Sequence, residues 1–79
     1  MSEYNNPVPT KCWEAFLIYC GCEFVKNDGS HHKWKCKNCW RSIIFWGHQK
    51  EVPRFHIKTN LHTMGKTNKD FNDWAAINC

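Results

Sequence analysis

Residues 29–32, Gly-Ser-His-His, place two imidazoles directly after a tight turn, at the start of an expected strand. Histidine titrates near neutral pH, so His31 is able to take up or release a proton there. Cleavage of RNA needs both steps, because the 2′-hydroxyl loses a proton and the leaving oxygen gains one. Two histidines at the start of a strand are also commonly half-exposed polar residues, and their spacing alone leaves both interpretations open.

Basic side chains accompany His31. Side chains alternate along a strand over residues 31–36, which puts Lys33 and Lys35 on the face of His31. Their ammonium groups could hold a phosphate and offset charge that develops in a transition state. Four more residues are candidate phosphate contacts, although each could be only a solvated charge: Lys26, Arg41, Arg54 and Lys58.

The whole chain is basic. Its 79 residues include 11 Lys and Arg against 7 Asp and Glu, which gives a net charge of +4. Such a charge suits nucleic acid, and it suits an ordinary basic surface equally well. The length predicts one domain over residues 10–79, after a flexible lead-in of residues 1–9. The chain starts without a secretory pattern and has no apolar run long enough to span a membrane, so we expect a cytoplasmic protein with no membrane partner.

The cysteines suggest a metal. In a cytoplasmic protein, thiols and metal ligands are more common than disulfides. A hairpin formed by residues 23–26 and 31–36 would bring a Cys-x-Cys pair and a Cys-x-x-Cys pair together at its base. Four thiolates there could bind a structural zinc ion, and buried thiols are the alternative. The four are Cys20, Cys22, Cys36 and Cys39. Cys12 and Cys79 look unpaired and are given no role.

The apolar periodicity and the turn residues predict an α+β domain with a helix, a three-stranded antiparallel sheet and a helical C-terminus. We expect a first helix from Thr10, as N-cap, to about Cys20, followed by strands over 23–26, 31–36 and 41–46. An extended segment over 52–55 and a short helical turn over 61–64, capped by Asn60, come next. A final helix is capped by Thr67. The strand over 41–46 is apolar on both faces, because Ile43 and Phe45 point one way while Ile44 and Trp46 point the other. One of these faces could be a protein interface.

The order of these motifs resembles the HicA family of mRNA interferase toxins. The likeness runs over residues 12–74 and rests on residues 21–25 (Gly-Cys-Glu-Phe-Val), 28–34 (Asp-Gly-Ser-His-His-Lys-Trp), 51–53 (Glu-Val-Pro), 58–65 and 67–71. It implies a fold like that of double-stranded-RNA-binding domains, the dsRBD-like fold. It further implies cleavage of mRNA without a catalytic metal, and silencing by a HicB-like antitoxin. The helical turn over 61–64 looks about one turn shorter than the family's.

Carried over by position, the family's catalytic histidine is His31. Gly29 and Ser30 shape the turn before it, and the Ser30 hydroxyl could orient the imidazole or a phosphate. His56 could reach the same face as a second acid or base, or be a simple surface residue. His48 and His62 are expected to be surface residues.

Two other classes of protein stay open. A non-catalytic nucleic-acid-binding module could use the same fold, stapled by zinc. A protein-interaction or inhibitor module could use the two-sided strand over 41–46 as its interface.

Overall fold

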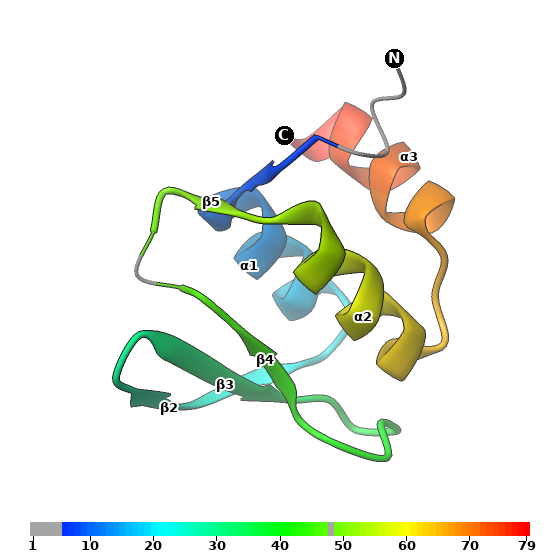
Figure 1. Cartoon of the computed structure of the whole chain (residues 1–79). Helices are drawn as coiled ribbons and strands as arrows, with labels where there is room; N and C mark the ends of the chain where they lie inside the picture. The colour runs from blue at the N-terminus through cyan, green and yellow to red at the C-terminus, as the bar shows by residue number, and fades with distance from the viewer. Residues whose placement is uncertain (1–5, 48) are drawn as a thin grey trace.

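A computed structural model describes residues 6–47 and 49–79. Its elements are β1 (Val8–Pro9), α1 (Thr10–Tyr19), β2 (Glu23–Asp28), β3 (His31–Lys35), β4 (Ile43–Phe45), β5 (Glu51–Val52), α2 (Arg54–Met64) and α3 (Asn68–Asn78). Strands β2, β3 and β4 form an antiparallel sheet in that order, and β1 pairs with β5. Helices α1 and α2 lie against one face of the three-stranded sheet, and α3 packs on α1 farther from it (Figure 1). The predicted α+β order of a helix, three antiparallel strands and a helical C-terminus is confirmed.

The β2–β3 hairpin turns on two residues. Asp28 pairs with His31, which leaves Gly29 and Ser30 as the loop. Gly29 has φ +64°, in the left-handed region that favours glycine, and glycine at the first loop position is typical of a type II′ hairpin. Strand β2 therefore continues two residues beyond the end predicted at residue 26, and His31 begins β3 directly after the loop.

The core is aromatic and lies between α1, the sheet and α3. Trp13 of α1 is fully buried, and its ring contacts the rings of Phe16, Phe45 and Phe71 at centroid distances of 5.5–6.3 Å. Burial of each such side chain contributes roughly 2 kcal/mol, so a few large rings stabilise a domain of this size. The inner face of β4 supplies Ile43 and Phe45, both fully buried.

Asn60 joins α2 to the outer edge of β4. Its amide donates to the Ile44 carbonyl over 2.9 Å and accepts from the Ile44 N–H over 3.4 Å. The prediction that Asn60 caps a short turn over 61–64 is wrong, because α2 already begins at Arg54 and Asn60 lies buried in its interior. Pro53 is the N-cap, so Arg54 and Phe55 are helical rather than extended.

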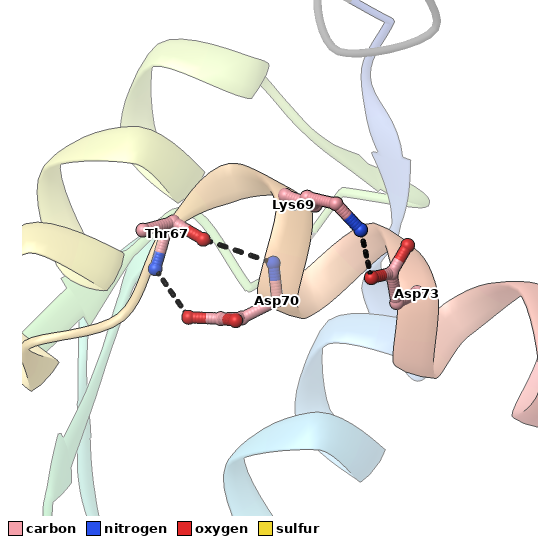
Figure 2. A network of polar contacts seen from close by, with 4 residues as sticks. All are labelled: Thr67, Lys69, Asp70 and Asp73. Carbon is pink, nitrogen blue, oxygen red and sulfur yellow. Dashed lines mark hydrogen bonds and ion pairs between the residues drawn. The ribbon is translucent and has the colours of Figure 1, made fainter.

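Thr67 is the N-cap of α3, as predicted, and it forms a capping box with Asp70. The Thr67 hydroxyl accepts from the Asp70 N–H, and the Asp70 carboxylate accepts from the Thr67 N–H (Figure 2). These bonds hold the pKa of Asp70 below its usual value. Within the same helix, Nζ of Lys69 lies 2.6 Å from a carboxylate oxygen of Asp73, four residues later, and the two form an ion pair.

The first helix begins as predicted but is capped differently. Pro9 occupies the N-cap position, and the Thr10 hydroxyl donates instead to the Gln49 carbonyl over 2.6 Å. Val8 and Pro9 pair with Val52 and Glu51, so the end of the expected lead-in of residues 1–9 is a strand. Residues 1–5 of that lead-in lie outside the described residues.

Two disulfides tie the chain together. Cys12 of α1 is bonded to Cys79 after α3, and Cys22 is bonded to Cys36 at the base of the hairpin. The prediction that Cys12 and Cys79 are unpaired is wrong, because α3 runs back along α1 and brings the two Cα atoms to 5.9 Å. Cys22 and Cys36 do meet at the hairpin base as expected, here as a disulfide with Cys20 and Cys39 left as free thiols.

Candidate functional site

His31 is exposed at the end of the sheet, where β3 leaves the Gly29–Ser30 loop. The indole N–H of Trp46, just past β4, donates to Nε2 of His31 over 2.9 Å. This bond needs an unprotonated Nε2, so neutral His31 carries its proton on Nδ1. Its imidazole is therefore held in one tautomer and one orientation, on the face opposite the core.

A second imidazole contacts the same indole. His56, in the first turn of α2, contacts the Trp46 ring edge to face at a centroid distance of 4.6 Å. Burial lowers the pKa of His56 below its usual value, and the nearby charge of His31 lowers it further. His56 is therefore biased toward the neutral form, which is able to accept a proton.

The consecutive residues His31 and His32 point to opposite faces of the sheet. His32 points to the inner face, where its ring contacts Phe45 and its Nδ1 lies 3.6 Å from a carboxylate oxygen of Glu14. A side chain at Gly47 would collide with the His32 ring, so glycine is needed for this packing. His32 is thus a packing residue, while His31 is open to a ligand.

The outer face of the sheet beside His31 is basic. Lys26 pairs directly with Lys33 across β2 and β3, after a bulge between Phe24 and Lys26. Like charges at directly opposed positions destabilise a sheet, so this pair favours a bound anion. Asp28, opposite His31, is the acidic residue next to the imidazole.

Two shallow hollows connect along this face. One is lined by Lys26, Asp28, His31, Lys33 and Ile44. The other shares Lys33 and continues past Lys35 to Trp40 and Arg41. We call the residues of the two hollows the basic sheet face. It also exposes apolar surface, since Ile44 and Val25 are each 49% and Trp40 is 73% exposed.

The structure brings most of the candidate site residues together and separates two. Lys26, Lys33, Lys35 and Arg41 share the basic sheet face with His31. Arg54 does not lie there, because it is buried at the start of α2. Its guanidinium donates to the Asn6 carbonyl and to the side chains of Asn68 and Asn72, which ties the N-terminal segment to α3. Lys58 is exposed on α2, off the sheet.

Trp46 was not among the candidate site residues, although it holds His31 and touches His56. The alternation along residues 41–46 puts Trp46 on the outer face with Ile44, so its position could be predicted. Its hydrogen bond to His31 could not be predicted, because that bond depends on how β3 and β4 pair. His62 is exposed as expected, and His48 lies outside the described residues.

The cysteines gather at the other end of the hairpin, where Cys39 also lines the second hollow of the basic sheet face. Cys20, Cys36 and Cys39 line one hollow together with Met64 and Lys66. Burial raises the pKa of the Cys20 thiol, Lys66 counteracts this, and Cys39 raises it again. With Cys22 and Cys36 joined, residues 6–47 and 49–79 contain no group of three or more side chains placed to hold a metal ion.

No protein-family model, curated protein or solved structure matches this chain. Among the residues that the structure describes, no helix has the length and apolar character needed to cross a membrane.

Proposed function

We propose that this chain is a toxin-type mRNA endoribonuclease in which His31 is the essential catalytic residue. The observation that carries the proposal is that Trp46 contacts two imidazoles, His31 and His56, and that His31 lies on the basic sheet face. Two histidines beside a cluster of lysines match what RNA cleavage demands, which is an acid, a base and a phosphate site.

The proposed reaction uses the substrate's own 2′-hydroxyl as nucleophile. His56, biased toward its neutral form, takes the proton from this hydroxyl as the oxygen attacks the adjacent phosphorus. The bond from phosphorus to the 5′-oxygen breaks, and that oxygen receives the Nε2 proton of His31 in its imidazolium form, after which neutral Nε2 accepts again from the Trp46 N–H. The products are a 2′,3′-cyclic phosphate and a 5′-hydroxyl, and no metal ion takes part.

The basic sheet face supplies the binding for this reaction. Lys26 and Lys33 are placed to neutralise the phosphate next to His31, and Lys35 and Arg41 to bind phosphates farther along the strand. Exposed Trp40, over which the Arg41 guanidinium lies at 4.7 Å, offers a ring on which a base can stack. Single-stranded RNA is the substrate that uses both properties.

The resemblance to the HicA family extends the proposal. The succession of α1, the sheet and α2 is compatible with the dsRBD-like fold expected of that family, with β1, β5 and α3 as additions. We therefore propose a HicB-like antitoxin as the protein partner, covering the face that carries His31, and the cytoplasm as the site of action.

Induced expression tests the proposal in cells. Wild type should arrest growth and deplete mRNA, His31→Ala should do neither at equal protein level, and the exposed-site control His62→Ala should behave as wild type. Intact mRNA in all strains would overturn the ribonuclease proposal. RNA binding that persists without cleavage would then favour a non-catalytic nucleic-acid-binding module, and loss of both would favour a protein-interaction module.

A further inference from the structure

Two tight turns present cysteines to one place at the base of the hairpin. The first ends α1, where the Gly21 N–H donates to the Ile18 carbonyl and the Cys22 N–H to the Leu17 carbonyl. These two bonds, with Gly21 at φ +84°, form a Schellman motif. The motif reverses the chain between Cys20 and Cys22.

The second turn follows β3. The Cys39 N–H donates to the Cys36 carbonyl over 3.3 Å, which closes a four-residue turn over residues 36–39. A Cys-x-x-Cys segment closed in this way is the usual means by which proteins bring two sulfurs to one zinc ion. This turn stands beside the first one, since the Cα atoms of Cys22 and Cys36 are 4.0 Å apart.

The remaining two cysteines face the same hollow. Cys20 and Cys39 are free, half-buried, and line it together with Cys36. A third turn, at the end of α2, brings Lys66 to its rim, and Lys37 lies there as well. Four thiolates around a divalent cation carry a net charge of −2, which these two ammonium groups are placed to offset.

We propose that Cys20, Cys22, Cys36 and Cys39 form a tetrahedral zinc site when the Cys22–Cys36 disulfide is reduced. A dithiol reductant delivers two electrons and two protons to the disulfide and becomes a disulfide itself. This leaves four thiols, of which Cys20, Cys36 and Cys39 line the hollow and Cys22 lies beside Cys36. One Zn²⁺ then replaces their four protons, and these are released to water. The ion joins the end of α1, the base of the hairpin and the β3–β4 loop. It is a structural site at the opposite end of β3 from His31, and it does not depend on the proposed ribonuclease activity.

Metal titration of the reduced full-length chain tests the site. Protein reduced with a phosphine in the absence of oxygen should bind one Co²⁺ with the thiolate-to-cobalt charge-transfer and visible bands of a tetrahedral sulfur site. Binding of the Co²⁺ should release about four protons at a pH well below the pKa of the thiols, and one equivalent of Zn²⁺ should then displace the Co²⁺ without further proton release. Native mass spectrometry should show a single zinc per chain.

Single substitutions distinguish this zinc site from nonspecific binding of zinc to individual thiols. Cys20→Ser and Cys39→Ser, which leave the Cys22–Cys36 pair intact, should each weaken zinc retention against a chelator by at least a hundredfold. Cys79→Ser, which removes a cysteine outside the cluster, should leave it unchanged. Failure of the reduced wild type to bind Co²⁺ tetrahedrally, or equal retention in all variants, would overturn the proposal, whatever the outcome of the RNA cleavage assays.

Discussion

Trp46 donates its indole N–H to Nε2 of His31 over 2.9 Å, and its ring contacts His56 at 4.6 Å. One side chain at the end of β4 therefore sets the position of both imidazoles. The relationship makes Trp46 a positioning residue in the proposed mechanism, because it touches the two proton-transfer groups and is not itself a proton donor to the substrate.

Trp46→Phe should lower kcat for RNA cleavage by roughly fivefold, because an aromatic ring stays while a hydrogen bond worth about 1 kcal/mol is lost. Binding of an uncleavable 2′-deoxy substrate should be unchanged. Steady-state kinetics and a binding titration measure the two quantities. Equal loss of binding and kcat, or a large drop in thermal stability, would indicate that Trp46 serves only the fold.

The opposed pair Lys26 and Lys33 should matter for RNA and not for folding. Replacement of both with Gln, in a His31→Ala background that prevents cleavage, should weaken RNA binding. It should reduce the slope of log K against log salt by about 1.4, at about 0.7 per phosphate contact. Thermal stability should stay equal or rise, because a like-charged cross-strand pair is removed. Lys11→Gln, on α1, is the matched control, and an unchanged salt slope in the double variant would exclude the basic sheet face as the RNA site.

His56 predicts a pH dependence of stability. Its pKa in the folded chain lies below the usual value of 6.5, so the unfolded chain takes up the proton first as the pH falls. The stabilisation is therefore present above about pH 6.5 and is lost as the pH falls toward the lowered pKa. Thermal unfolding between about pH 8 and pH 5 should show a shallower decline for His56→Gln than for wild type. The same substitution at exposed His62 should leave the wild-type decline in place, and identical curves for all three proteins would contradict the assignment.

The Cys12–Cys79 disulfide should stabilise the domain strongly. It closes a sequence separation of 67 residues, for which loop entropy gives a contribution of about 4 kcal/mol. Under non-reducing conditions Cys79→Ser should lower the free energy of unfolding in urea by roughly 2–4 kcal/mol. Cys20→Ser, at a free thiol, is the control for loss of a cysteine. Equal stability of wild type and Cys79→Ser would show that the bond does not constrain the chain.

Local pattern predicted much of this fold. The helix beginning at Thr10, the N-cap at Thr67 and the alternation that faces His31 away from Trp34 all depend on neighbours within a few residues. The strand over 41–46 was expected to have two apolar faces, and it buries Ile43 and Phe45 while Ile44 stays half exposed. Such features follow from the periods of helix and strand.

The sequence predictions are wrong where contacts between residues distant in sequence determine the role of a side chain. Asn60 looks like a cap because asparagine is common there, but its amide is used by the edge of β4, 16 residues away. Arg54 looks like a phosphate contact because it is basic, yet Asn68, Asn72 and the Asn6 carbonyl take up its guanidinium. The pairing of Cys12 with Cys79 needs α3 to pack on α1, which no local pattern shows.

Cleavage of a short RNA by the purified chain, in the presence of a metal chelator, tests the central claim most directly. Wild type should produce 2′,3′-cyclic phosphate and 5′-hydroxyl ends, and a 2′-deoxy nucleotide at the cleaved position should block the reaction. His31→Ala should be slower by roughly 100-fold or more, the range for loss of a general acid or base, while His62→Ala cleaves as wild type does. Equal rates for wild type and His31→Ala, or no cleavage by either, would contradict the account.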